Sequence, residues 1–223
     1  MKSIRTLSTV SSTMVLGIFS AQLMAADMHQ YKMDAWSDNW FSAYLDGELL
    51  VEDSVSIRTE RSFNAETVEF KAGESFQLAF ILKDFIENDT GLEYIGSRRQ
   101  QMGDGGFIMQ VTNLDTGKVV AVSSDAMQCD VIHKAPLDKS CEKESNPIAG
   151  QGACQFSAQQ APNNWQSPSF DASDWSQATE HSRYAVSPKG GYNKIDWDGQ
   201  AKFVWGEDLE QDNTLLCRLK VQS

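Results

Sequence analysis

The sequence lacks the short motifs that mark the commonest catalytic centres. It has no G-x-S-x-G nucleophile elbow and no H-E-x-x-H zinc motif. Only three histidines and four cysteines are present, and no two cysteines have the C-x-x-C spacing typical of metal or redox sites. Paired carboxylates can hydrolyse glycosidic bonds, but an acidic chain contains many such pairs by chance. The sequence therefore predicts a protein that is not an enzyme, with a secreted hydrolase as an alternative.

Basic residues are also scarce. Lysine and arginine total 19 against 31 acidic residues, for a net charge of −12. The first 26 residues carry two basic and no acidic side chains, so without them the net charge is −14. A surface of this sign repels phosphate backbones and anionic lipid headgroups. We therefore expect no nucleic-acid partner, whereas cations, neutral sugars and basic proteins remain possible partners.

Long apolar runs are confined to the beginning of the chain. Lys2 and Arg5 precede an apolar stretch at 13–24, and the small residues Ala25-Ala26 follow it. This order predicts a signal peptide at 1–26, because the apolar stretch is too short to span a bilayer. An uncleaved anchor is the alternative. No later stretch predicts a membrane span, so we expect an exported protein, either periplasmic or secreted.

All four cysteines lie beyond the predicted signal peptide. An even number of cysteines in an exported chain predicts disulfides, and four cysteines allow three pairings. We favour Cys141–Cys154, which closes a short polar loop, and Cys129–Cys217, which joins a mid-chain strand to the last one. The first pair lies in a polar excursion at 135–164 that shows little periodicity.

Most of the remaining chain shows the two-residue alternation of half-buried strands. The clearest case is 40–51, where Asp46-Gly47 predicts a tight hairpin turn, and Asp115-Thr116-Gly117 predicts a second. The predicted strands are 40–45, 49–51, 68–70, 76–85, 107–112, 118–123, 127–133, 203–205 and 214–221. Helical periodicity is limited to one or two turns, for example around 174–180. This pattern predicts a single all-β domain at 36–223, an antiparallel β-sandwich, preceded by a flexible segment at 27–35.

Three segments carry a family resemblance. Residues 39–50 (NWFSAYLDGELL) resemble the hairpin of galactose-binding-like jelly-roll domains, which include carbohydrate-binding modules and discoidin-type domains. Residues 168–175 (PSFDASDW) are similar to the P-x-F-D-D-S-x-W phrase of those domains, and 201–205 with 212–218 resemble their closing strands. The hairpin precedes the phrase, the reverse of the order in many members. The resemblance implies a jelly-roll fold and carbohydrate binding, although fold analogy does not settle function.

The segment 87–106 is the best candidate for a functional loop. It is long and rich in glycine, and parts of it resemble a signature of bacterial exported proteins. Oxygen ligands gather in and just before it, and such ligands bind Ca²⁺. The candidate calcium ligands are Asp84, Glu87, Asn88, Asp89, Glu93 and Asp104. A solvated acidic loop, neutralised by Arg98 and Arg99, is the structural alternative.

Aromatic rings near polar side chains suggest a sugar site. The apolar face of a sugar stacks on an exposed ring while neighbouring polar groups bind its hydroxyls. We take Trp36, Tyr94, Arg98 and Arg99 as candidate ligand-binding residues. A single tryptophan in a sandwich is more often structural.

The expected start of the exported chain holds Met28, His29 and Met33, whose soft ligand atoms suit copper. A disordered tail with incidental Met and His is the simpler explanation. The leading prediction is an exported, non-catalytic protein that binds a carbohydrate or similar polar ligand, with a structural calcium ion as an open possibility. The alternatives are a periplasmic copper-handling or envelope interaction protein and a secreted hydrolase.

Overall fold

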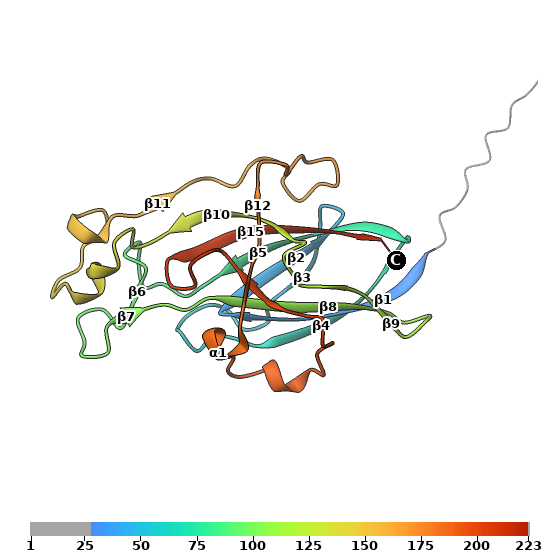
Figure 1. Cartoon of the computed structure of the whole chain (residues 1–223), viewed down its shortest axis with the longest axis horizontal. Coiled ribbons are helices and arrows are strands. Elements are labelled where there is room, and N and C mark those ends of the chain that lie inside the picture. The colour runs from blue at the N-terminus through green and yellow to red at the C-terminus, as the bar shows by residue number, and fades with distance from the viewer. Residues whose placement is uncertain (1–27, 223) are drawn as a thin grey trace, which may run out of the picture.

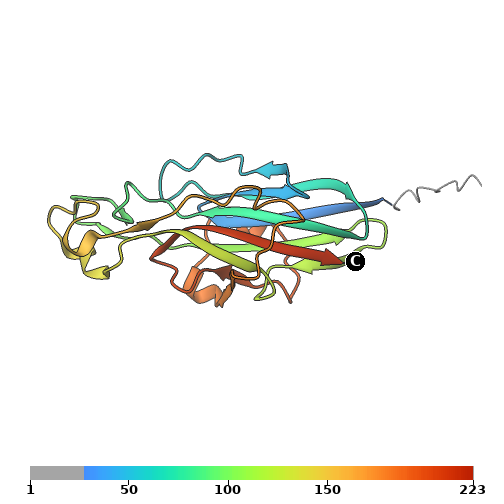
Figure 2. The ribbon, with the colours of Figure 1, turned by 90° about the horizontal axis from the view of Figure 1, so that it is seen from above.

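The computed structural model describes residues 28–222, which form two antiparallel sheets packed face to face (Figures 1 and 2). In the first sheet the strands run in the order β13 (Thr179–His181), β14 (Phe203–Trp205), β8 (Gly106–Asn113), β1 (His29–Asp38) and β4 (Ala65–Ala72), and β9 (Lys118–Val122) also pairs with β8. In the second the order is β11 (Ser157–Ala158), β10 (Gln128–Lys134), β15 (Asp212–Gln222), β5 (Ser75–Lys83), β2 (Trp40–Leu45) and β3 (Glu48–Glu52), and β12 (Ser176–Gln177) pairs with β10. The predicted antiparallel β-sandwich is therefore confirmed.

The main core lies between the two sheets. Phe80 on β5 and Phe41 on β2 both pack against Phe107 on β8, with ring centroids 5.1 and 5.7 Å apart. All three rings are fully buried. Burying a ring of this size stabilises the fold by about 2–3 kcal/mol relative to leaving it exposed. Alternate residues of the long strands β5 and β15 supply this core, as the two-residue period predicts.

Each sheet also has a covered outer face. Trp36 and Phe203 of the first sheet pack under the segment that contains α1 (Arg183–Val186) and the 3-10 turn Tyr192–Lys194. On the second sheet, the segment around Trp165 and Trp175 packs against Ala79 and Leu216, together with other apolar side chains. The aromatic phrase at 165–175 therefore covers the second sheet, and the phrase at 201–205 contains strand β14 of the first sheet. Both phrases are structural elements.

A buried arginine fixes the segment at 165–170 to the second sheet. The guanidinium of Arg218 donates hydrogen bonds to the carbonyl oxygens of Trp165 and, at 2.9 Å, Ser167. It also lies 5.4 Å from the ring centroid of Phe170. Burial lowers the pKa of Arg218. A guanidinium carries five donors, so carbonyl oxygens can satisfy it where no carboxylate is present.

Both predicted hairpins and both predicted disulfides are confirmed. Asp46 and Gly47 join β2 to β3 with φ values of 50° and 98°, and Gly117 ends the turn between β8 and β9 with φ 70°. The disulfides are Cys129–Cys217 and Cys141–Cys154. Cys129 and Cys217 lie directly opposite each other on β10 and β15, so the cross-link reinforces an existing strand pair.

Two predictions about local structure are wrong. From His29 onward the expected flexible segment at 27–35 is part of β1, which pairs with both β4 and β8. Its inward residues Tyr31, Met33 and Ala35 alternate and enter the main core. The expected helical turn around 174–180 contains β12 and β13, because both segments pair with neighbouring strands.

The predicted signal peptide at 1–26 lies outside the described residues. Within residues 28–222, no helix has the length and apolar character needed to cross a membrane.

Candidate functional site

A pocket of about 450 Å³ opens at the end of the sandwich that carries the small sheet of β6 (Leu92–Glu93) and β7 (Gln101–Met102). In Figure 1 this end lies opposite the C-terminus. The lining combines acidic, basic, amide and aromatic side chains from four separate parts of the chain. The lining residues are Glu60, Arg61, Phe63, Glu93, Tyr94, Gln101, Asp104 and Lys189.

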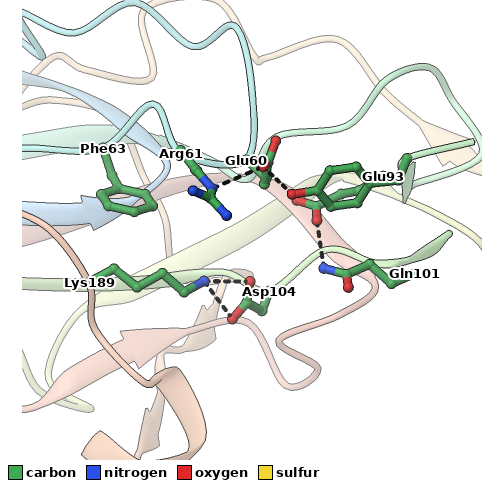
Figure 3. A pocket seen from close by; sticks show the side chains of 8 residues that line it. Glu60, Arg61, Phe63, Glu93, Gln101, Asp104 and Lys189 are labelled. Carbon is green, nitrogen blue, oxygen red and sulfur yellow. Dashed lines mark hydrogen bonds and ion pairs between the residues drawn. The ribbon is translucent and has the colours of Figure 1, made fainter. Parts of the chain in front are cut away.

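One wall is built around Tyr94 and Glu60. The Tyr94 hydroxyl donates a hydrogen bond to the Glu60 carboxylate. This carboxylate also lies 3.4 Å from the Nε of Arg61 (Figure 3). This hydrogen bond lowers the pKa of Glu60 and raises the pKa of Tyr94. The guanidinium of Arg99 covers the Tyr94 ring at 4.1 Å from its centroid. Tyr94 has φ 53°, an uncommon conformation for a non-glycine residue that often marks functional positions.

The opposite wall is built around Lys189. Its ammonium lies 3.3 Å from both carboxylate oxygens of Asp104 and 3.5 Å from Oδ2 of Asp38 (Figure 3 shows the Asp104 pair). Lys189 occupies a turn between Ser187 and Gly191, both of which have positive φ. This turn is anchored from the first sheet, because the indole Nε1–H of Trp36 donates to the Gly190 carbonyl at 2.9 Å.

Glu93 stands between these walls. Its carboxylate accepts a hydrogen bond from the Gln101 amide at 2.8 Å, across the β6–β7 pair. Burial, opposed by that hydrogen bond and reinforced by the negative charge of Asp104, raises the pKa of Glu93 to about 7. At neutral pH this carboxyl can therefore either donate or accept a hydrogen bond.

Two further buried carboxyls lie behind the pocket. Burial raises the pKa of Asp38 at the end of β1 to about 7, although the Lys189 charge opposes the shift. Asp84 follows β5 and is completely enclosed, so burial raises its pKa well above the ordinary value, and the charges of Asp38, Glu93 and Asp104 add to the effect. Neither carboxyl oxygen of Asp84 has a hydrogen-bond partner among the described residues.

The absence of a side chain at Gly103 leaves room for the carboxyl of Asp84. A Cβ on Gly103 would come within 2.1 Å of Oδ2 of Asp84, so only glycine lets the backbone pass this carboxyl. The segment that carries Asp104 into the pocket therefore runs directly over Asp84. The four carboxyls of Asp38, Asp84, Glu93 and Asp104 interact electrostatically as one group.

The structure brings together some of the expected calcium ligands. Asp84, Glu93 and Asp104 are three of the four interacting carboxyls at the pocket, whereas the other three expected ligands have different partners. Glu87 accepts from the Ile95 amide at 3.1 Å, Asn88 from the Thr90 amide at 2.9 Å, and Asp89 lies 3.2 Å from His133. Across residues 28–222, no three or more His, Cys, Asp or Glu side chains are arranged to hold a metal ion. A calcium site stays a prediction.

The expected sugar-binding residues divide in the same way. Tyr94 lines the pocket, and Arg99 stacks on it from outside. Arg98 is exposed and does not line the pocket. The assignment of Trp36 to the ligand is wrong, because its indole is fully buried in contact with Phe63, Tyr192 and Phe203. Trp36 instead supports the turn that presents Lys189.

The residues considered for copper are spread along β1. Met33 is buried in the main core, and His29 forms an ion-pair contact with Asp115 at 3.0 Å. Met28 is exposed. Metal binding by all three would require Met33 to leave the core, so the copper alternative gains no support from this arrangement.

The sequence identifies three of the eight lining residues as candidates, Glu93, Tyr94 and Asp104, and Gln101 lies in the same candidate loop. Glu60, Arg61 and Phe63 come from the loop between β3 and β4, and Lys189 comes from the segment after α1. One local signal was available, because Asn39 is a polar residue at a strand boundary. Its buried side chain donates to the Glu60 carbonyl at 2.9 Å and accepts from the Phe85 amide at 2.6 Å, which ties the loop to the sheet.

The disulfide Cys141–Cys154 supports the pocket from outside. Both cysteines pack with Leu92 and Met102, the apolar neighbours of Glu93 and Gln101.

Replacing both cysteines by alanine should lower the free energy of unfolding by about 2–3 kcal/mol, since the disulfide closes a short loop. Urea unfolding of the wild type and the double variant measures this. An unchanged midpoint would show that the cross-link contributes nothing to the stability of this end.

No protein-family model, curated protein or solved structure matches the chain. The function must therefore be argued from the chemistry of the pocket.

Proposed function

We propose that this chain is an exported binding protein whose pocket between Tyr94 and Lys189 takes a carbohydrate or a similar hydroxyl-rich ligand. The proposal rests mainly on one observation: aromatic rings, hydrogen-bond donors and hydrogen-bond acceptors together line one pocket of about 450 Å³. A volume of this order accommodates a small ligand of one or two rings.

The aromatic side chains suit a ring with an apolar face. Phe63 and Tyr94 both line the pocket, and they come from different loops. A sugar presents C–H groups on one face and hydroxyls around its edge, so a ring contact and polar contacts can form together. Tyr94 is only partly buried, which leaves part of its surface open.

The polar side chains suit hydroxyl groups. A hydroxyl both donates and accepts, so it needs acceptors and donors within reach. Glu60 and Asp104 supply carboxylate acceptors, and Gln101, Arg61 and Lys189 supply donors. The donors are already held by neighbouring carboxylates, which fixes their positions before a ligand arrives and reduces the entropy lost on binding.

The fold and the disulfides agree with this proposal. An antiparallel sandwich with long loops at one end is compatible with the galactose-binding-like jelly roll that the three sequence segments resemble. The two disulfides fit an oxidising compartment, as expected for a periplasmic or secreted protein. The proposal includes a structural calcium ion at the interacting carboxyls of the pocket, and calcium binding is tested together with ligand binding.

A glycan array tests the proposal, with calcium and with a chelator. We expect binding by the wild-type protein and a loss of about tenfold for Tyr94→Ala, because the variant removes one ring face worth about 1.5 kcal/mol. The matched control is Tyr184→Ala, since Tyr184 is 94% exposed and lies outside the pocket. An array without any bound glycan in either condition would refute the proposal. If the melting temperature is the same in calcium and in chelator, the calcium part of the proposal is refuted.

A further inference from the structure

Carboxyl groups outnumber cationic groups at this pocket. Three line it and two lie directly behind it, whereas the lining holds only two basic side chains. The carboxyl groups are those of Glu60, Glu93, Asp104, Asp38 and Asp84, and the basic side chains are Arg61 and Lys189. A site that takes a neutral ligand needs no such excess.

Both basic side chains already have carboxylate partners. Arg61 lies beside Glu60, and Lys189 lies between Asp104 and Asp38. No basic side chain of the lining is left to pair with Glu93. Burial raises the pKa values of Glu93, Asp38 and Asp84, so these carboxyls are not all ionised at neutral pH. Oδ1 of Asp38 and both oxygens of Asp84 have no hydrogen-bond partner among the described residues, and both side chains are almost completely buried. Neither side chain lines the pocket, so a ligand bound there would act on them through its charge, and a cation would favour their ionised forms.

The contacts of Lys189 show that the side chains of this pocket can hold an ammonium group. Its ammonium is held by two oxygens of Asp104 at 3.3 Å and lies 5.9 Å from the ring centroid of Phe63. Carboxylates together with an aromatic face form a cage for a primary ammonium group. Glu93 and Tyr94 also line the pocket and supply a second carboxyl and a second aromatic ring.

We infer that the ligand of this pocket carries a primary ammonium group, and that this group binds between Glu93 and Asp104 while the ring of the ligand contacts Tyr94 and Phe63. This inference rests on the proposed function and narrows it to amine-bearing saccharides. Polyamines share the ammonium chemistry but lack the hydroxyl-rich ring, so the test must separate the two.

The test uses an array of matched saccharide pairs. Trimers of glucosamine, galactosamine and mannosamine are printed as free amines and as their N-acetylated forms at pH 6.5. We expect the best amine to bind at least about tenfold more tightly than its acetylated form, because acetylation removes a charge-assisted hydrogen bond. Glu93→Gln should reduce this preference to about twofold or less.

Two further variants guard against loss of folding. Asp104→Asn changes a part-exposed side chain. It should weaken the binding of the amine by more than the binding of the acetylated form, so the ratio of the two affinities should fall. Glu144→Gln is the matched control, since Glu144 is exposed at the same end of the molecule and does not line the pocket. It should leave both affinities unchanged.

The outcomes separate this inference from the proposed function. Equal binding of amine and acetylated forms would overturn the ammonium site while the carbohydrate proposal stands. Binding of no saccharide, with spermidine binding that depends on Glu93, would support the ammonium site and refute the carbohydrate. Displacement of the amine by Ca²⁺, with the same dependence on Glu93, would overturn the inference in favour of a metal site.

Discussion

The substitution Asp84→Asn should raise the free energy of unfolding, and the gain should grow as the pH rises from 5 to 8. Asp84 is enclosed, and burial raises its pKa well above the ordinary value of 3.8. In the folded protein it therefore keeps its proton at a pH where the unfolded chain has lost it. Asparagine has a similar shape and does not titrate, so the variant escapes this cost.

The sign follows from proton linkage. A carboxyl with a raised pKa stabilises the folded state fully only below the pKa of the unfolded chain, and this contribution falls as pH rises toward the folded-state pKa. Each such group costs up to about 1.4 kcal/mol per pH unit over that range. The gain of Asp84→Asn should thus increase as the pH rises above 5, because the pKa of Asp84 is raised in the folded protein.

Urea unfolding of wild type and variant at pH 5, 6.5 and 8 measures the effect. Asp125→Asn is the control, because Asp125 is exposed, so the same chemical change there removes no enclosed carboxyl. A gain that is constant with pH, or a loss at pH 8, would contradict an enclosed and protonated Asp84. The wild type should itself lose stability as the pH rises from 4 to 7. Burial raises the pKa of Asp38, Asp53 and Glu93 to about 7, so in this range the folded protein keeps protons that the unfolded chain has lost.

Gly91→Ala should destabilise the protein by about 4 kcal/mol and abolish ligand binding. Gly91 has φ 73°, and a Cβ there would come within 2.0 Å of the carbonyl oxygen of Ala135. This oxygen belongs to the backbone and cannot move aside as a side chain would. The substitution must therefore displace β6 and with it Glu93.

Gly96→Ala is a matched control for Gly91→Ala. Gly96 lies in the same loop with φ 75°, but a Cβ there would meet no atom within 4 Å. It shares the conformational penalty of about 1 kcal/mol without the collision. Chemical unfolding and array binding of both variants measure the difference. Similar stability losses would show that the contact between Gly91 and Ala135 does not position β6.

The fold could be predicted well where the information is local. Asp46-Gly47 favours positive φ values, and the alternation around it defines two strands, so the hairpin follows from a few neighbouring residues. The strand β1 was missed although Tyr31, Met33 and Ala35 alternate. Its polar residue Asp34 is buried and accepts hydrogen bonds from Thr67 on β4 at 2.7 Å and from Gln110 on β8 at 3.2 Å. Partners on another strand cannot be read from the segment itself.

The site could be predicted only in part, for the same reason. The loop 87–106 attracted attention because it is long and rich in oxygen ligands, and it does contribute Glu93, Tyr94 and Asp104 to the pocket. Lys189 is separated from Asp104 by 85 residues, and no local pattern marks it. Trp36 was assigned to the ligand because tryptophan often binds sugars, but its strand faces a covering segment that the sequence did not reveal.

A crystal structure with the strongest array ligand tests the central claim most directly. The account predicts ligand density between Glu93 and Asp104, with the ring of the ligand in contact with Tyr94 or Phe63. Density at another place, such as the groove beside Trp175 and Asp130, would contradict it even if the affinity were high.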